Sequence, residues 1–403
     1  MPSDAAGLTA HAAPPAIAPP PTLSEIAREW TRIGCVGFGG PAAHIALIRQ
    51  LVVERRGWIS AHELEDAIGA TNLLPGPGST QLAIFCAWRL GGIRGALVGG
   101  FGFIVPGLIV ILALSALFLA ASPPTWVRGA GAGAGAAVGA VALQAGLGLL
   151  APGWRRHAGA RRARWLAWVV LGGLAAATLG AWLVLVLLGC GAAELLWQRP
   201  AMRARAGGRA NTHGWPLLVA AAAATGGLGA LAWTAFKVGA LSYGGGFVII
   251  PLMQADAVGA HHWMTSGQFV NAVALGQVTP GPVVHTVAVV GYAAAGIGGG
   301  LLAAAVAFAP SFSFILLGGA RFDRLRGNGA ARAFLDGAGP AAIGAIVGST
   351  IPLARALSEG WQFAVLAAAV VTVLIAKRGV VVTLVGAGVV GAALGLAGAP
   401  LPG

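Results

Sequence analysis

The stretch NLLPGPGSTQ, residues 72–81, interrupts an otherwise apolar run with two prolines and two glycines. A second stretch of the same kind, QVTPGPVVHT, occupies residues 277–286. Proline removes a backbone hydrogen-bond donor and glycine weakens a helix further, so each PGP triplet is predicted to break a helix. The fold must therefore explain two similar breaks in one hydrophobic chain.

The composition indicates a membrane protein. Of 403 residues, 57% are hydrophobic and 9% are charged, against about 25% charged residues in an ordinary soluble domain. Apolar runs such as 96–121 are long enough to cross a bilayer, which takes about 20 residues. Because these runs are continuous and rich in alanine, leucine and glycine, they favour helices over a β-barrel. We expect an all-α polytopic membrane protein.

Charge and cysteine content argue against other classes. The formal net charge of +13 is expected to come from arginines in cytoplasmic loops, and not from a nucleic-acid surface. Cys35, Cys86 and Cys190 lie far apart in apolar segments and match neither a zinc nor a redox spacing. No metal or cofactor is predicted. Residues 1–22, rich in proline and alanine, are expected to be a disordered tail.

A shift of 205 residues superposes the two PGP regions without a gap. It gives eleven identities over residues 34–77, among them Trp58 on Trp263 and the PGP triplets on each other. The chain is therefore expected to hold two units of one design. The predicted domains are the tail 1–22, a first repeat 23–198, a basic cytoplasmic linker 199–215 and a second repeat 216–403.

Each repeat is expected to contain a glycine-broken first segment, a re-entrant PGP-broken hairpin and four further crossings. The broken first segments are predicted at 23–50 and 233–255, and the hairpins at 61–88 and 266–292. The further crossings are predicted at about 96–121, 129–151, 164–179 and 181–197, and at about 297–318, 333–351, 361–376 and 379–398.

Loop charges predict that the two repeats insert in opposite orientations. The loop with Arg55 and Arg56 is basic, whereas its counterpart holds His261 and His262, and other loops reverse in the same way. In an inverted arrangement, nineteen of the 25 lysines and arginines lie on one face, the cytoplasmic one. We therefore expect two inverted-topology repeats with about ten transmembrane helices and two re-entrant hairpins. This count would place both termini outside.

The broken helices form the candidate substrate site. A helix start leaves about four backbone N–H groups unpaired, and small residues before it let an oxyanion approach them. In inverted-repeat transporters, such starts point at an anionic substrate. A hinge or tight packing is the alternative for any single break, but four breaks paired by a repeat favour a transport site. The candidate substrate-binding residues are Arg32, Phe38, Gly39, Gly40, Asn72, Pro75, Gly76, Pro77, Ser79, Thr80, Gln81, Lys237, Tyr243, Gly244, Gly245, Gln277, Thr279, Pro280, Gly281, Pro282, His285 and Thr286.

Among these candidates, Arg32 and Lys237 are equivalent in the repeat and fall inside the first crossings. Cations within a membrane are costly, so contact with substrate is predicted, with snorkelling to the interface as the alternative. Asn72 and Gln277 precede the PGP triplets and could either orient a ligand or satisfy freed backbone groups.

Proton coupling is not visible in the sequence. His44 and His285 follow breaks and could titrate near neutral pH, although a single histidine is more often only hydrogen-bonded. No chain of acidic residues within the membrane stands out. An acidic cluster beside the first hairpin is expected to be a solvated face paired with Arg55 and Arg56; it comprises Glu54, Glu63, Glu65 and Asp66.

The broken segments resemble the chromate ion transporter family, in its long two-domain form. The resemblance covers about residues 23–398 and is carried by both repeats. Its first-repeat stretches are GCVGFGGPAAHIALI (34–48), RRGWIS (55–60) and LLPGPGSTQLAIFCAWRLGGIRGAL (73–97). Its second-repeat stretches are KVGALSYGGGFVIIPL (237–252), WMTSGQFVNAVALGQVTPGP (263–282) and GYAAAGIGGG (291–300).

The resemblance implies a secondary transporter that exports chromate across the inner (plasma) membrane of a bacterial cell, with sulfate as a second or exchanged dianion. The implied partners are chromate and the lipid bilayer, with a homodimer left open and no nucleic acid. This chain has VVHT at 283–286, where the family commonly has smaller or aromatic residues followed by threonines. His285 is therefore expected to affect substrate preference.

Two other classes of function are weaker alternatives. An anion channel would use the same broken helices without alternating access, and it could only dissipate a gradient. An enzyme within the membrane would need Ser79 or His285 as a catalytic group beside a partner base. No GxSxG or HExxH motif occurs in the chain, so we expect a transporter and not an enzyme.

Overall fold

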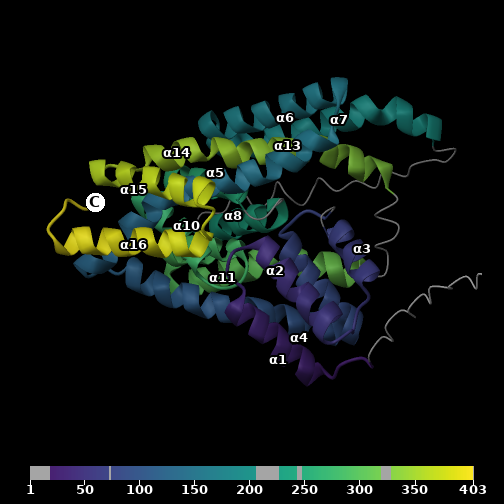
Figure 1. The fold of residues 1–403 in the computed structure, drawn as a ribbon, viewed down its shortest axis with the longest axis horizontal. Helices are drawn as coiled ribbons and strands as arrows, with labels where there is room; N and C mark the ends of the chain where they lie inside the picture. Colours follow the sequence, from purple (N-terminus) through teal and green to yellow (C-terminus); the bar gives the residue numbers. More distant parts are fainter. Residues whose placement is uncertain (1–18, 72–73, 206–226, 243–246, 319–327, 403) are drawn as a thin grey trace, which may run out of the picture.

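The computed structural model describes residues 19–71, 74–205, 227–242, 247–318 and 328–402. Across these ranges the regular structure is helical throughout, without a strand, which confirms the all-α prediction for this part of the chain (Figure 1). Four predicted site residues, Asn72, Tyr243, Gly244 and Gly245, lie outside the described residues, as do most of the predicted tail and linker.

Several helices are apolar enough to lie in a membrane. Within the described ranges, Gly78–Phe118, Thr125–Arg156, Val283–Gly318 and Gly329–Arg355 are long enough to cross one by themselves, and shorter apolar helices accompany them. These helices support a multi-pass membrane protein. The count of ten crossings stays a prediction.

Similar series of elements occur in the two halves of the described chain, with differences in the short helical turns. The first series is α1 (Leu23–Val36), α2 (Pro41–Arg49), the π-helix η1 (Gln50–Arg55), α3 (Ala61–Thr71), α4 (Gly78–Phe118), α5 (Thr125–Arg156), α6 (Gly159–Thr178), the 3₁₀ turn η2 (Gly180–Trp182) and α7 (Leu183–Arg205). The second is α8 (Leu228–Leu241), α9 (Ile249–Gln254), the π-helix η4 (Ala255–Ala260), α10 (Ser266–Val278), the 3₁₀ turn η5 (Val283–His285), α11 (Thr286–Gly318), α13 (Gly329–Gly348), α14 (Thr350–Arg355), α15 (Gly360–Val370), the π-helix η7 (Val371–Ile375) and α16 (Val380–Leu396). The ends of α8 and η4 follow those of α1 and η1 by 205 residues.

Local sequence accounts for the helix ends. Thr22 and Glu25 form a reciprocal capping box that starts α1, and Thr265 and Gln268 form the same box at the start of α10. Pro41 begins α2 directly after the glycine break, where its missing N–H has no helical role.

Glycine is required at the centre of each PGP loop. Gly76 has φ +117° and Gly281 has φ +90°, values that strain a residue with a side chain. Pro77 and Pro282 then take the N-cap positions of the next helices. Each PGP triplet therefore ends one helical segment and starts another, as the sequence predicts.

The long α4 and α11 each contain a sharp turn. Gly92 has φ +59° and Gly296 has φ +63°, so the chain reverses direction between two helical arms. A Cβ on Gly99 would overlap Ala87, and one on Gly299 would overlap Gly291, because the arms pack closely against each other. The turn falls between the predicted hairpin and the crossing that follows it.

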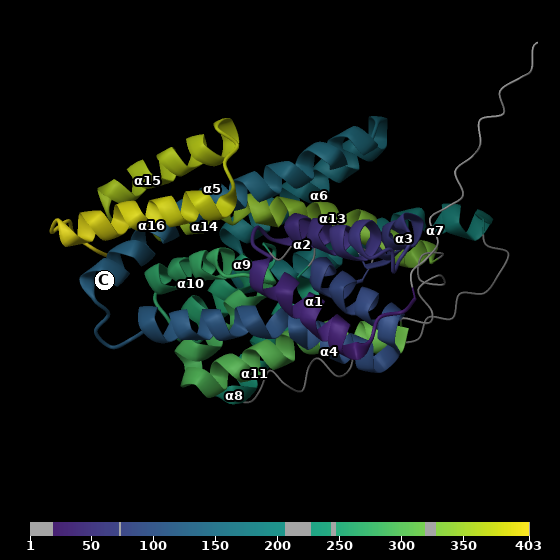
Figure 2. The same cartoon turned by 60° about the horizontal axis from the view of Figure 1, so that its bottom comes forward.

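The two halves of the chain exchange their last helices. α15 and α16 pack against α5 of the first half, while α6 and α7 pack against α13 of the second, as Figures 1 and 2 show. Each half therefore covers the other, and neither forms a separate bundle.

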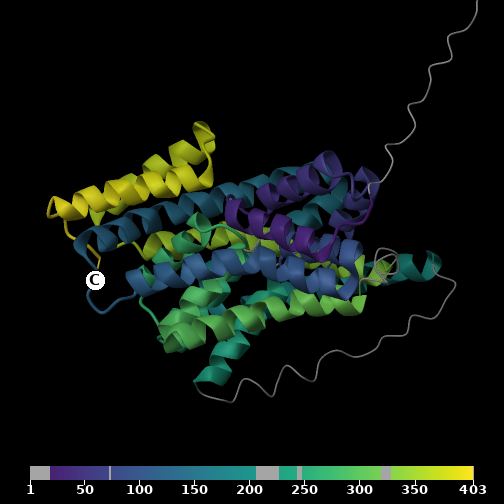
Figure 3. The same cartoon turned by 90° about the horizontal axis from the view of Figure 1, so that it is seen from below.

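The second arms of α4 and α11, which follow their sharp turns, lie side by side (Figure 3). Gly100 of α4 lies against Phe312 of α11, and Leu112 of α4 against Gly300 of α11. Residue numbers rise along one arm as they fall along the other, so these equivalent arms run in opposite directions.

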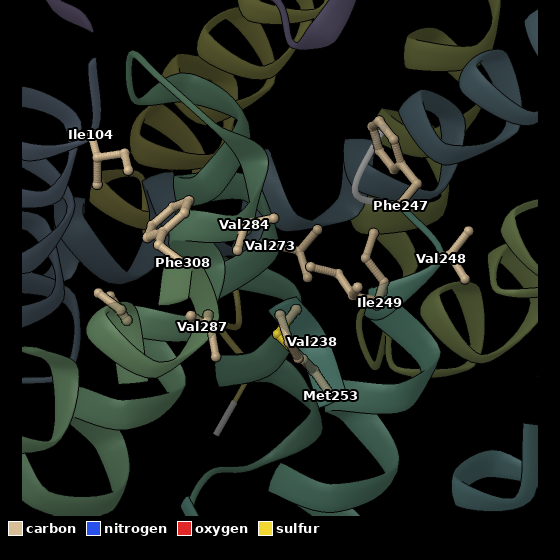
Figure 4. Packing of buried hydrophobic residues seen from close by; sticks show 14 of the residues in the cluster. Ile104, Val238, Phe247, Val248, Ile249, Met253, Val273, Val284, Val287 and Phe308 are labelled. Carbon is tan, nitrogen blue, oxygen red and sulfur yellow. The ribbon is translucent and has the colours of Figure 1, made fainter. Parts of the chain in front are cut away.

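Apolar side chains fill the space around this contact. Figure 4 shows Ile104 of α4, Val238 of α8, Val273 of α10, and Val284 and Phe308 beside the second PGP loop. All five belong to one buried cluster. The second PGP loop is consequently buried throughout, whereas the first has Gly76 and Pro77 buried and Pro75 exposed.

Candidate functional site

Each PGP loop presents the bare start of a helix. Pro77 precedes α4 and Pro282 precedes η5, and no side chain caps either start. The first N–H groups of a helix have no intrahelical carbonyl partner and carry a partial positive charge. Two short arrays of backbone donors therefore lie within the core.

The second PGP loop lies against the first half of the chain. The N–H of Gly281 donates to the carbonyl of Gly37, at 2.9 Å, in the break between α1 and α2. A Cβ on Gly107 of α4 would overlap the Pro280 carbonyl and lie 2.8 Å from Cε1 of His285. This loop is therefore enclosed by α1 and α4.

The first PGP loop makes the reciprocal contacts with the second half. A Cβ on Gly76 would lie 3.1 Å from the carbonyl of Gly239 in α8 and 3.6 Å from Oγ of Ser311 in α11. We call the two PGP loops and the helix starts that follow them (residues 75–81 and 280–286), together with Ser242, Gln277 and Ser311, the crossing site.

A hydrogen-bonded chain through His44 joins the two helix starts. Nε2 of His44 lies 2.9 Å from the Gly37 carbonyl, which also accepts from Gly281, and Nδ1 lies 3.3 Å from Oγ of Ser79. A carbonyl can only accept, so neutral His44 carries its proton on Nε2 and accepts from Ser79 at Nδ1. His44 is therefore a fully partnered, structural histidine.

The crossing site contains buried polar atoms without protein partners. Among the described residues, they are Oγ1 of Thr80, Oε1 of Gln81, Oγ of Ser242, Nε2 of Gln277, both ring nitrogens of His285 and Oγ of Ser311. Only the Nε of Arg164 shares this state elsewhere in the described chain. An unpaired buried polar group costs about 1–3 kcal/mol, and most such groups in proteins are satisfied. Four of these residues lie within four positions of a PGP triplet, and Ser311 lies beside Gly76, which indicates a place for a polar ligand.

Other predicted residues of the site donate their hydrogen bonds to backbone carbonyls of the protein. The hydroxyl of Thr279 donates to the Leu275 carbonyl at 2.9 Å, and that of Thr286 donates to the Val283 carbonyl at 2.8 Å. The amide of Gln81 donates to the Pro75 carbonyl at 2.7 Å and so supports its own loop. These three groups shape the site.

The structure does not bring every predicted residue to the crossing site. Phe38 is exposed beside the first break, where Gly39 and Gly40 form the backbone turn. The side chain of Arg32 is 59% exposed, and its carboxylate partner at 4.0 Å is Glu29 of the same helix. Contact between Arg32 and a substrate stays a prediction.

Lys237 is largely buried and forms an ion pair with an acidic residue that the sequence analysis did not select. Its Nζ lies 2.5 Å from Oδ2 of Asp256 in η4, which also accepts from the hydroxyl of Thr234 at 2.9 Å. Asp256 could have been selected from the sequence because it is an aspartate in an apolar segment. The equivalent position of the first half, 205 residues earlier, holds Leu51. Ser242 and Ser311 were missed as well, because single serines carry little pattern.

The acidic cluster pairs differently from the prediction. Arg56 binds Glu29 at 2.6 Å and does not bind the cluster. The cluster residues find other partners: Glu63 with Arg89 at 2.5 Å, Glu65 with Arg49 at 3.3 Å and Asp66 with His62 at 3.3 Å. The predicted pairing was wrong for Arg56. Glu29 is far from Arg56 in sequence, but the fold brings α1 next to Arg56, which pairs with it.

Two other site types can be assessed in the same region. An apolar cavity of about 280 Å³ lies beside Pro75 between α7, α8 and α13, and its apolar lining does not suit a dianion. No group of three histidine, cysteine or acidic side chains that could hold a metal ion occurs in the part of the chain that the structure describes.

Comparison with known proteins identifies the relatives of this chain. The chromate transporter family model matches residues 24–195 and 229–392. A chromate transport protein of Cupriavidus metallidurans is 32% identical over 400 residues, which is 95% of each chain. One of Pseudomonas aeruginosa is 30% identical over 89% of this chain and 86% of its own. A probable chromate transport protein of Synechococcus elongatus is 29% identical over 83% and 85%. No solved structure matches.

Proposed function

The chain belongs to the chromate transporter family, and from this premise we propose that it is a secondary transporter that exports chromate from the cytoplasm across the inner membrane. Chromate binds at the crossing site, between the helix starts that follow the two PGP loops. Family membership supports the substrate, and the direction of transport and the binding site are our proposal.

The concentration of unpartnered donors in the crossing site carries this proposal. A tetrahedral dianion offers only acceptors, and the site offers the hydroxyls of Thr80, Ser242 and Ser311, the amide of Gln277 and the imidazole of His285. Backbone N–H groups at the two helix starts add donors with a favourable dipole. These groups would pair with the oxygens of chromate as it replaces its hydration shell.

Alternating access follows from an inverted repeat. The opposite directions of the equivalent arms in α4 and α11, and the reciprocal contacts of the two PGP loops, support that topology. Because each loop rests on the other half, a movement between the halves would open one loop and cover the other. The substrate would then reach one side of the membrane at a time.

Sulfate is the second candidate substrate. It is a tetrahedral dianion like chromate, and the donors of the crossing site are neutral groups that recognise shape and charge without a chromium-specific contact. We expect sulfate to compete with chromate and to exchange with it across the membrane.

Chromate accumulation in everted membrane vesicles tests this function. Vesicles that contain the protein should take up radiolabelled chromate above the outside concentration when the membrane is energised, and unlabelled sulfate should slow this uptake. Control vesicles without the protein should not accumulate it. Equilibration without accumulation would instead identify an anion channel, and no uptake would overturn the proposal.

A further inference from the structure

A buried ion pair lies one turn before the end of α8. It joins Lys237 of α8 to Asp256 of η4, and the two side chains are 17% and 7% exposed. Removing two charges from water costs several kcal/mol that their attraction hardly returns, so such a pair contributes little net stability. Its presence beside a broken helix needs a further explanation.

The position of the acidic partner differs between the two halves. At the shift of 205 residues, Lys237 corresponds to Arg32, but Asp256 corresponds to Leu51. Arg32 is paired within its own helix to Glu29 and is exposed. The second half therefore has a carboxylate where the first half has a leucine, and this carboxylate faces a largely buried cation.

Among the described residues, Lys237 is the charged side chain that pairs with Asp256. η4 contacts α8, α9, α10 and η2, and Lys237 is the one titratable side chain that these four elements carry. The nearby His261 is exposed and contacts Asp256 through its backbone N–H. If Lys237 moves away, Asp256 loses this salt-bridge partner.

The ion pair is also close to the crossing site. Ser242, whose buried hydroxyl has no partner, follows Lys237 by five residues, a little more than one helical turn of about 5.4 Å. Between them, the carbonyl of Gly239 lies against the position of Gly76 in the first PGP loop. The ammonium group is therefore carried by the helix end that contributes to the proposed substrate site.

We propose that Asp256 competes with the substrate dianion for the ammonium group of Lys237, and that Asp256 takes up a proton when the dianion displaces it from Lys237. This inference rests on the proposed function. Without substrate, the carboxylate neutralises Lys237. When chromate binds, Lys237 turns toward it, and the carboxylate of Asp256 accepts one proton from water, because a buried carboxylate without a partner favours its neutral form.

The consequence is thermodynamic linkage between chromate and protons. If chromate binding promotes protonation of Asp256, then protonation of Asp256 promotes chromate binding by the same factor. Chromate affinity should rise as the pH falls, and each bound dianion should bring about one proton with it.

Proton uptake on chromate binding tests this linkage with the purified full chain. In a weakly buffered, mildly alkaline solution, where chromate is a dianion, a pH electrode should record uptake of about one proton per chromate bound by the wild type. Binding without proton uptake would overturn the inference and leave the proposed function intact. Absence of chromate binding would overturn both.

Three variants separate linkage from a structural ion pair. Asp256→Asn should bind chromate at least as well as the wild type in alkaline solution, with no proton uptake and no pH dependence. Lys237→Met should bind chromate about tenfold more weakly, a loss of about 1.4 kcal/mol, and without proton uptake, because no ammonium group is left to exchange between partners. Glu194→Gln removes another buried carboxylate, which pairs with Arg164 at 3.3 Å, and should keep the proton uptake. Equal uptake by Asp256→Asn and the wild type would contradict the proposal.

Discussion

The backbone N–H of Gly281 donates a 2.9 Å hydrogen bond to the carbonyl of Gly37, which joins the second PGP loop to the helix break of the other half. Through His44, the same carbonyl is connected to Ser79 at the start of α4. The two PGP loops are consequently parts of one hydrogen-bonded unit, although they are about half the chain apart in sequence.

Gly281→Ala should impair transport by straining this unit. The φ of +90° disfavours a side chain, and its Cβ would lie 3.0 Å from Cε1 of His285. We expect a cost of about 1–3 kcal/mol and a loss of transport of about tenfold or more, measured as initial chromate uptake at matched protein levels. Gly69→Ala in α3, where a Cβ meets nothing within 4 Å, is the control and should transport normally. Normal uptake by Gly281→Ala would contradict the role of this loop.

His285→Leu separates function from stability. Neither ring nitrogen of buried His285 has a partner in good hydrogen-bond geometry, although the Ile104 backbone lies close to the ring. An apolar replacement should therefore leave the thermal midpoint nearly unchanged or higher. Chromate uptake should fall at least tenfold, because a substrate donor is lost. His44→Leu should instead lower the midpoint, since His44 has two partners. A His285→Leu protein that is unstable but fully active when folded would refute this assignment.

Ser311→Ala should weaken chromate binding without affecting folding. The hydroxyl is buried and unpartnered beside Gly76, and one hydrogen bond to a charged ligand is worth about 1.5–3 kcal/mol, or about 10- to 100-fold in affinity. Ser313→Ala provides the matched control on the same helix, because its hydroxyl is bound to the Ala309 carbonyl at an exposed position. Equal affinities of both variants in equilibrium binding would show that Ser311 does not contact the substrate.

Single cysteines at equivalent positions should test the inverted topology. Glu54 in η1 and Gly259 in η4 are related by the 205-residue shift, and both are exposed. In a background without the three native cysteines, a membrane-impermeant maleimide should label Glu54→Cys from the cytoplasmic side and Gly259→Cys from the outside. Labelling of both from the same side would exclude inverted repeats.

The sequence predicted most of the element order because glycine and proline mark the positions where the helices are broken. The PGP triplets, the turn before Pro41 and the 205-residue repeat together located α1 to α4 and α8 to α11 within a few residues. The π-helices η1, η4 and η7 and the exchange of α15 and α16 onto α5 were not predictable. They depend on how small residues of distant helices pack, which no local pattern records.

The parts of the candidate site that depend on backbone conformation were predictable from the sequence. The parts that depend on which hydrogen-bond partners surround a side chain were not. Gly76 and Gly281 stand out in sequence because their conformations need glycine. Ser311 gave no signal, and Asp256 stood out only against Leu51 of the other repeat. Whether a donor is free or occupied, as with His285 and Thr286, is decided by neighbours in space.

Equilibrium binding of radiolabelled chromate to the purified wild type, His285→Leu and Ser313→Ala, at matched folding, tests the central claim most directly. If the crossing site holds the dianion, the wild type and Ser313→Ala should bind one chromate per chain with equal affinity, displaced by sulfate, and His285→Leu should bind at least tenfold more weakly. Equal affinity of all three proteins would contradict the claim and place the substrate elsewhere.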